Sequence, residues 1–129
     1  MRMMRKYNII FGTLLILWFL ASIITSILPS ESIPIDYIFG YDKFLHVIKF
    51  IFFSIILYNF LHYTRFNYKT KLAIYIPLQF YPILDELIQL NIPSRSYSAY
   101  DILANYFGVL IGVIISILIR VAIHKKRVI

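Results

Sequence analysis

Acidic, basic, amide and hydroxyl side chains are concentrated between Asp85 and Asn105, beside some of the most apolar sequence in the chain. A buried polar group costs several kcal/mol unless it is paired, so this concentration predicts a specific role. A His among carboxylates supports general acid–base chemistry, and an Arg can hold a phosphate or carboxylate bidentately. The candidate catalytic residues are His46, Glu86 and Asp101, and the candidate substrate-binding residues are Lys43, Gln89, Arg95, Ser98 and Asn105.

Several well-defined chemistries have no residues to support them. The chain has no Cys, which excludes thiol nucleophiles and cysteine metal sites. It also lacks a strained Ser elbow, a His-Glu-x-x-His helix and a Gly-rich phosphate loop. One His among oxygen ligands could hold Mg²⁺ or Mn²⁺ but makes a poor zinc site, and we assign no metal ligand and no cofactor. No reaction can be named from these residues, so whether the protein is an enzyme stays open.

Composition predicts a membrane protein. Of the 129 residues 60% are hydrophobic and 18% aromatic, and the mean hydropathy is +0.78. Such a chain has too little polar surface to cover a water-soluble fold of this size. We expect a single membrane domain over residues 1–129.

The apolar runs predict an all-α, four-helix transmembrane bundle. Each run is long enough to cross a bilayer as a helix. Pro77 and Pro82 lie inside the third run and predict a kink near Leu78 to Pro82. A cleaved signal peptide is the alternative for the first run, which is long for one and lacks a clean cleavage site. The predicted spans are 9–28, 44–61, 72–90 and 102–119.

The distribution of charge predicts the orientation. Ten of the 13 Lys and Arg residues fall on one side of the four-span arrangement, which places that side and both termini in the cytoplasm. All six acids fall in the opposite loops or the adjoining helix ends, so the polar site is expected at the extracytoplasmic face. The bases form three short clusters beside the spans rather than one groove-sized face, which argues against nucleic-acid binding despite the net charge of +7.

Helical spacing predicts that the polar residues converge. Each of the last three spans carries a polar stripe on one face, and the stripe of the fourth span continues into two glycines that would let this helix approach a neighbour closely. A polar cup open to the outer surface follows. The stripes are Asp42, His46 and Lys49; Gln79, Pro82, Glu86 and Gln89; and Asp101, Asn105, Gly108 and Gly112.

Structural roles can also explain these residues. Asp42 is a natural N-cap for the second span, and Ser98 with Asp101 has the spacing of a capping box. His46 could be a core residue that bonds a neighbouring carboxylate. Glu86 lies about one turn inside its span and needs a partner such as Arg95, Lys43, Lys49 or a proton.

The order of these motifs resembles the VanZ-like family. The resemblance covers roughly residues 29–112, with Ser94 where many members have Gly and Phe50 where many have Tyr. It implies a small polytopic protein of the bacterial envelope, of a type whose namesake is associated with teicoplanin resistance, and it implies no settled activity. The motifs are Asp42-Lys43-Phe-Leu-His46, Asp85-Glu86-x-x-Gln89, Pro93-Ser94-Arg95, Ser98, Asp101, Asn105 and Gly108.

Two hypotheses of different classes therefore stand. In the first, the cup binds or processes the anionic or polar head group of a membrane lipid or lipid-linked envelope precursor, with Arg95 holding the anion and Glu86 or His46 moving a proton. In the second, the protein is a non-enzymatic accessory protein and the polar residues only lock the helices together. A channel or transporter is less well supported, since the inner halves of the first and fourth spans contain no ionisable residue. Nothing in the sequence sets the oligomeric state.

Overall fold

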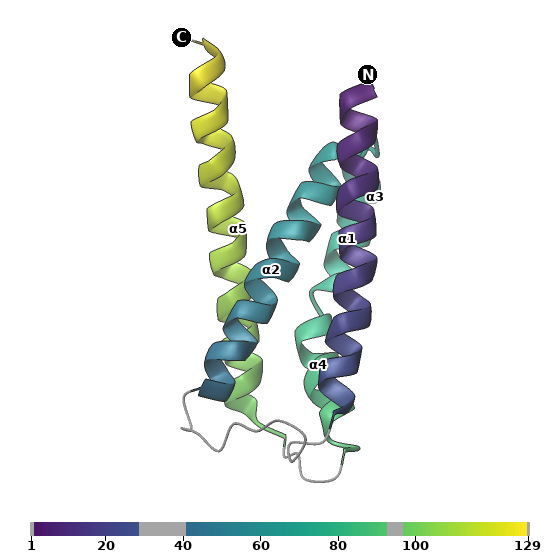
Figure 1. The fold of residues 1–129 in the computed structure, drawn as a ribbon, viewed down its shortest axis with the longest axis vertical. Coiled ribbons are helices and arrows are strands. Elements are labelled where there is room, and N and C mark those ends of the chain that lie inside the picture. The colour runs from purple at the N-terminus through teal and green to yellow at the C-terminus, as the bar shows by residue number, and fades with distance from the viewer. Residues whose placement is uncertain (1, 29–40, 93–96, 129) are drawn as a thin grey trace.

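The protein is all-α in the part of the chain that the computed structural model describes, residues 2–28, 41–92 and 97–128. Three of its helices are long and apolar enough to cross a membrane, over Met3–Ile27, Asp42–Tyr63 and Ala99–Lys125. These three spans indicate a multi-pass membrane protein. The helices within the described ranges are α1 (Arg2–Ile27), α2 (Tyr41–Tyr63), α3 (Tyr68–Leu78), α4 (Tyr81–Gln89) and α5 (Ala99–Val128) (Figure 1).

The predicted third span, 72–90, is two helices rather than one kinked helix. α3 ends at Leu78 and α4 begins at Tyr81, so the break falls where the two prolines predicted a kink. Pro82 lies in the first turn of α4, where the amide hydrogen that it lacks would have had no helical acceptor. The location of the irregularity was predicted correctly, but the prediction of one helix with a kink was wrong.

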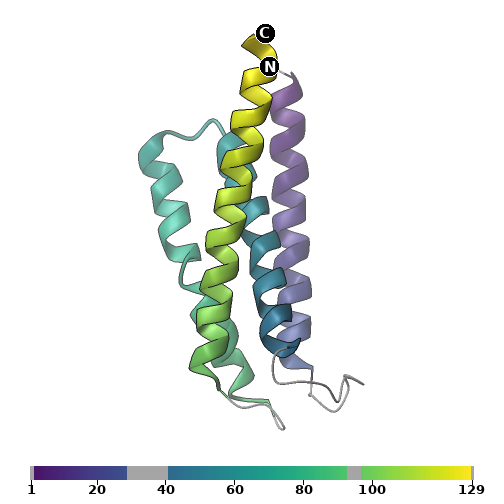
Figure 2. The ribbon, with the colours of Figure 1, turned by 90° about the vertical axis from the view of Figure 1, so that its left-hand side faces the viewer.

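The helices run back and forth between the two ends of the molecule. The start of α1 and the end of α5 lie at the same end, and α3 and α4 together descend towards the other end, where α5 begins (Figure 1). Seen from the side, α3 stands apart from α5 (Figure 2), and it contributes no fully buried residue. Placing both termini at one end agrees with an even number of passes. Which side of the membrane that end faces stays a prediction.

A cluster of aromatic rings forms the core at the level where α1, α2 and α4 meet. Phe50 and Phe53 are fully buried, and Trp18 lies 4.7 Å from Phe53 between ring centroids. Tyr81 packs edge-on against Phe19 at 4.8 Å. Such pairs stabilise beyond the apolar area they bury, by about 0.5–1.5 kcal/mol each. Phe50, which stands where many members of the family have Tyr, therefore serves the core.

The predicted close approach of a neighbouring helix at Gly108 and Gly112 is confirmed, and that neighbour is α2. α2 and α5 form the most extensive helix pair. A Cβ on Gly108 would overlap the carbonyl oxygen of Val47, and one on Gly112 would lie 2.6 Å from that of Ile51. Only residues without a side chain permit this approach, which brings the polar start of α5 against the polar start of α2.

Candidate functional site

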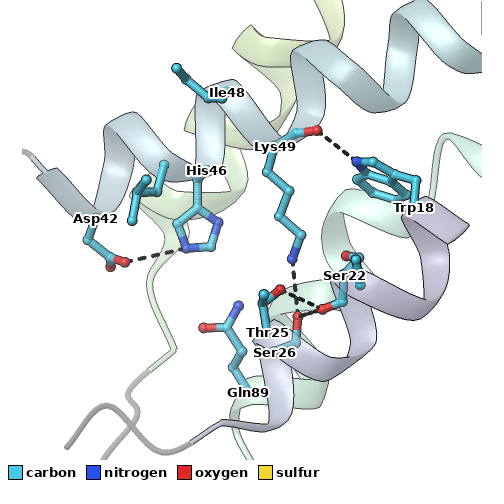
Figure 3. A pocket seen from close by; sticks show the side chains of 11 residues that line it. Trp18, Ser22, Thr25, Ser26, Asp42, His46, Ile48, Lys49 and Gln89 are labelled. Carbon is cyan, nitrogen blue, oxygen red and sulfur yellow. Dashed lines mark hydrogen bonds and ion pairs between the residues drawn. The ribbon is translucent and has the colours of Figure 1, made fainter. Parts of the chain in front are cut away.

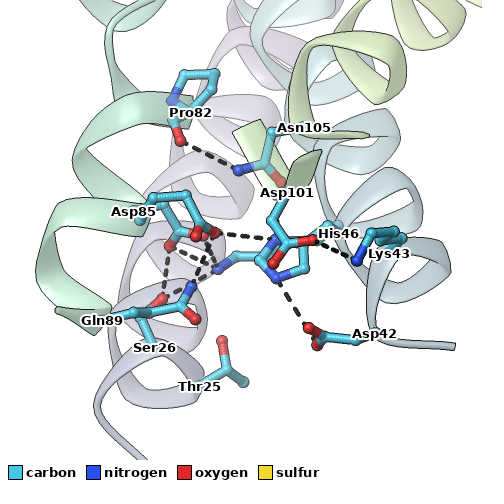
Figure 4. Close-up of polar contacts among 12 residues, drawn as sticks. Thr25, Ser26, Asp42, Lys43, His46, Pro82, Asp85, Gln89, Asp101 and Asn105 are labelled. Atoms are coloured by element: carbon cyan, nitrogen blue, oxygen red, sulfur yellow. Dashed lines mark hydrogen bonds and ion pairs between the residues drawn. The ribbon is translucent and has the colours of Figure 1, made fainter. Parts of the chain in front are cut away.

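The polar residues near one end of the bundle form a single buried group, which we call the polar cluster. It is built from α2, α4 and α5, and α1 closes one side of it (Figure 4). Its members are Asp42, Lys43, His46, Lys49, Asp85, Glu86, Gln89, Asp101 and Asn105.

The deepest part of the polar cluster is an ion pair between Asp85 and Lys49. The Asp85 carboxylate is fully buried, and Lys49 Nζ lies 2.7 and 2.8 Å from its two oxygens. On α1, Ser26 Oγ donates to Asp85 Oδ1 at 2.5 Å and Ser22 Oγ approaches the same atom at 3.4 Å. Two helices, α1 and α2, thus supply partners for a carboxylate on α4, as a buried charge requires.

The ion pair is extended by a chain of hydroxyl groups. Tyr81 Oη donates to Ser22 Oγ at 2.9 Å, which joins the ion pair to the aromatic core. Lys49 also donates to Ser26 Oγ at 3.1 Å. The Trp18 indole donates to the backbone carbonyl of Lys49 at 3.2 Å. These bonds hold α1 against α2 and α4, so this part of the polar cluster is a structural lock.

His46 lies at the centre of the other part, and Asn105 fixes its ring. Asn105 Nδ2 donates to the carbonyl of Pro82 at 3.1 Å, so Asn105 Oδ1 is the atom that faces His46 Nδ1, at 2.9 Å. An amide oxygen only accepts, which assigns the hydrogen to Nδ1. His46 Nε2 then points to the Asp42 carboxylate, 3.8 Å away.

Glu86 is buried beside His46. Its Oε1 lies 3.5 Å from His46 Nδ1 and accepts a hydrogen bond from Gln89 Nε2 at 3.3 Å. The backbone of Ser98 comes close enough to interact with the same carboxyl group. Within the described ranges, Oε2 has no hydrogen-bond partner. His46 is therefore a partner of Glu86, whereas Lys49, one of the partners considered from the sequence, pairs with Asp85 instead.

Asp101 connects the start of α5 to α2. Its Oδ1 lies 3.3 Å from Lys43 Nζ, and the residue is buried. The backbone N–H of Asp101 donates to the carbonyl of Ser98 at 3.0 Å, which begins the helix. Asp42 lies inside the first turn of α2, where a carboxylate suits the helix dipole, rather than before the helix as an N-cap would.

The structure brings together most of the residues singled out from the sequence. Lys43, Gln89, Ser98 and Asn105 all lie within or beside the group formed by the three candidate catalytic residues. Arg95 lies outside the described residues, so its pairing with Glu86 stays a prediction. Proximity alone does not test what these residues do, so their catalytic and binding roles remain predictions.

Sequence reasoning missed the α1 side of the site and the role of Asp85. Ser22 and Ser26 are four residues apart on the first span, a spacing that places two hydroxyls on one helical face. Asp85 was passed over because its neighbour Glu86 occupied the expected stripe. Adjacent residues point about 100° apart on a helix, and both can be buried only because α1 and α5 flank α4 on different sides.

A cavity of about 370 Å³ adjoins the polar cluster between α1 and α2 (Figure 3). In Figure 3 the Lys49 side chain extends towards Ser26 along one side of it. Leu45 and Ile48 also line the cavity, and both are partly exposed on the outer surface of α2. The cavity is therefore amphipathic, with apolar walls and polar groups at its base. Its lining residues are Trp18, Ala21, Ser22, Thr25, Ser26, Asp42, Leu45, His46, Ile48, Lys49 and Gln89.

Three long apolar helices around a buried acidic and basic cluster define an integral membrane protein with an internal polar site. Comparison with known families agrees with the resemblance seen in the motifs. The family model VanZ/LLP1 matches residues 2–120, and the chain belongs to that family. No curated protein and no solved structure shows significant similarity to it.

Proposed function

We propose that this protein binds the polar head group of a membrane lipid or lipid-linked envelope precursor in the bacterial cell envelope. The observation that carries the proposal is the amphipathic cavity between α1 and α2, which joins the polar cluster to the outer surface of two membrane-spanning helices. A bound molecule with one polar end and one apolar chain fits such a cavity.

The walls of the cavity suit an acyl chain. Leu45 and Ile48 are 42% and 36% exposed, on a helix that is apolar enough to lie in lipid. Ala21 contributes a small side chain at the corresponding face of α1. An acyl chain lying over these residues would keep apolar contact with the surrounding bilayer, so a lipid could enter without leaving the membrane.

The base of the cavity suits a head group. His46 and Gln89 belong to the polar cluster and also line the cavity, so a head group at its base would lie next to hydrogen-bonding groups. His46 and Glu86, 3.5 Å apart, could exchange a proton with a bound group. We assign anion binding to Arg95, with Lys43, Gln89, Ser98 and Asn105 as further contacts. The site is proposed to face the extracytoplasmic side, and a contribution to glycopeptide resistance would follow from binding an envelope precursor there.

The proposal is tested by the lipids that accompany the purified protein. Extraction in a mild detergent followed by lipid mass spectrometry should find one lipid class in near-stoichiometric amount. Ala21→Phe fills the cavity and should release that lipid, whereas Ala73→Phe, an exposed Ala on α3, should retain it. Random bulk lipid in all three proteins would overturn the proposal.

The alternative function is that of a non-enzymatic accessory protein whose polar residues only hold the helices together. The network around Asp85 favours it, because each oxygen of that carboxylate already has a partner. The two functions differ in what isosteric substitutions around His46 should do to phenotype and to stability.

A further inference from the structure

The polar cluster contains more negative than positive charge. Among the described residues it has four carboxylates and two lysines. Lys49 neutralises Asp85 at 2.7 Å, and Lys43 approaches Asp101 more loosely at 3.3 Å. The pairs leave Asp42 and Glu86 beside one imidazole. Carboxylates crowded into a site of low polarity favour a bound cation.

Two carboxylate oxygens in this cluster lack the hydrogen bonds that buried oxygens normally have. Glu86 is fully buried and Asp101 is 5% exposed. Neither Glu86 Oε2 nor Asp101 Oδ1 has a hydrogen-bond partner in the described part of the chain. The Lys43 contact with Asp101 Oδ1 is longer than the 2.7–2.9 Å or so of a charge-assisted hydrogen bond, so it leaves that oxygen able to accept another ligand.

The orientation of His46 points to the same conclusion. With its Nδ1 hydrogen donated to Asn105, a neutral His46 presents the lone pair of Nε2 to the carboxylate of Asp42. A lone pair facing a carboxylate is repelled unless a proton or a metal cation lies between them. A His that donates one ring nitrogen to an oxygen and offers the other is the arrangement found in metal sites.

We propose that Asp42, His46 and Asp101 form a divalent-cation site. One ligand atom from each lies within 4.8 Å of the other two, so all three lie within about 2.8 Å of a common point. Metal–ligand distances in such sites are about 2.0–2.6 Å, which small side-chain adjustments would reach. Two carboxylate ligands suit Mn²⁺, and the single imidazole is the ligand that transition metals take more readily than Mg²⁺ or Ca²⁺ do. Asn105 is a positioning residue that holds the imidazole.

A second group of ligand atoms, from His46, Asp85 and Glu86, also lies within 4.8 Å. It is the weaker candidate, because Lys49 holds both oxygens of Asp85 at 2.7 and 2.8 Å and Ser26 donates to one of them, whereas Lys43 contacts one oxygen of Asp101 at the longer distance of 3.3 Å. Glu86 instead lies beside the proposed site, with its Oε1 3.5 Å from His46. The inference does not depend on lipid binding, although a cation at this position could hold an anionic head group.

Mn²⁺ binding to the purified full chain tests the site without any added lipid. Free Mn²⁺ gives a six-line electron paramagnetic resonance spectrum that is lost on binding, so a titration yields both stoichiometry and affinity. We expect one strong site. Asp42→Asn, His46→Gln and Asp101→Asn should each weaken it at least about tenfold, and Asn105→Ala should weaken it by about 10–100-fold through the released ring.

His124→Gln is the matched control, because it removes an exposed His at the far end of α5 and should bind as the parent does. Asp42→Asn keeps the test decisive even if buried variants fold poorly, since the Asp42 side chain is 65% exposed. Parent-like Mn²⁺ affinity in a folded Asp42→Asn protein, or no strong site in the parent, would overturn the proposal. Loss of lipid from the Ala21→Phe protein with Mn²⁺ binding intact would leave it standing.

Discussion

His46 is the residue at which α2, α4 and α5 meet, and its two ring nitrogens face different partners. Nδ1 is tied to Asn105 on α5 and lies near Glu86 on α4, while Nε2 faces Asp42 on its own helix. A buried imidazole needs a partner for each of its two ring nitrogens, and His46 has one on each side. The arrangement is what a proton-transfer or ligand-binding residue requires, held in one orientation by a neighbour.

Isosteric substitutions separate chemistry from structure. If the site binds or processes a ligand, Glu86→Gln, Asp101→Asn and His46→Gln should each abolish any envelope-drug phenotype, such as teicoplanin resistance. Membrane abundance and melting temperature should stay near those of the parent, because functional groups are often not stabilising ones. Drug susceptibility and thermal unfolding, measured on the same variants, provide the comparison.

Asp101→Asn is the most informative of these variants, because Asn keeps the shape and discards the charge that faces Lys43. A parallel fall in phenotype and stability would favour the accessory protein. A fully active and fully stable Asp101→Asn protein would remove Asp101 from the site.

The Lys49–Asp85 pair should behave as a buried salt bridge. Truncating either partner, by Lys49→Met or Asp85→Leu, leaves the other uncompensated and should destabilise by about 3–5 kcal/mol. Replacing both should cost less than the sum of the single changes. Unfolding measured over the complete double-mutant cycle gives the coupling.

Lys43 and Asp101 offer a comparison within the same cluster, because their contact is longer and Lys43 is more exposed than Lys49. Their coupling should be smaller. A coupling energy of zero between Lys49 and Asp85 would show that this ion pair does not stabilise the fold.

At the scale of helices, the interruption between α3 and α4 is what buries the site. α4 is nine residues long, and five of them are buried: Tyr81, Pro82, Asp85, Glu86 and Gln89. A helix so short can set its own direction, independent of α3. Tyr106 of α5 donates to the carbonyl of Gln79 at 2.9 Å, which satisfies a backbone group at the interruption.

The contact between α2 and α5 should depend on Gly108. Gly108→Ala places a methyl group against the Val47 carbonyl, a backbone atom that cannot move without shifting its helix, so we expect a loss of about 1–3 kcal/mol. The same substitution at Gly12 meets only the edge of the Phe60 ring at 3.3 Å and should be mild, because a side chain can turn aside. Thermal unfolding of the two proteins, with folded yield in membranes, measures the difference. Equal tolerance at both glycines would refute the close-packed seam.

At the scale of the whole molecule, the return of both termini to one end makes the orientation testable. The chain has no Cys, so single cysteines can be introduced without background. Cysteines at positions 30 and 94 should react with a membrane-impermeant reagent added to intact cells, and Thr70→Cys should not, since the ten bases place its side in the cytoplasm. The reverse pattern would turn the polar site towards the cytoplasm and remove the envelope-precursor proposal.

Much of the architecture was determined by the sequence alone. Apolar run length predicted the long spans, because a bilayer requires a fixed number of apolar residues. Helical periodicity predicted that Asp101 and Asn105 share a face with the two glycines, and the close approach of α5 to a neighbour followed from residues without side chains. These are local or one-dimensional properties, which is why sequence was sufficient for them.

Tertiary structure alone decided the partners of the buried charges. A helical wheel ranks residues by direction but cannot say which of several cations will lie near a given carboxylate. Lys49 pairs with Asp85 rather than Glu86 because α1 contributes Ser22 and Ser26 on that side of α4. The cavity beside them arises where α1 and α2 meet, and the Lys49–Ser26 contact at its edge joins residues 23 positions apart in the chain. Partners of that kind depend on how separate helices pack, and no spacing within one helix encodes them.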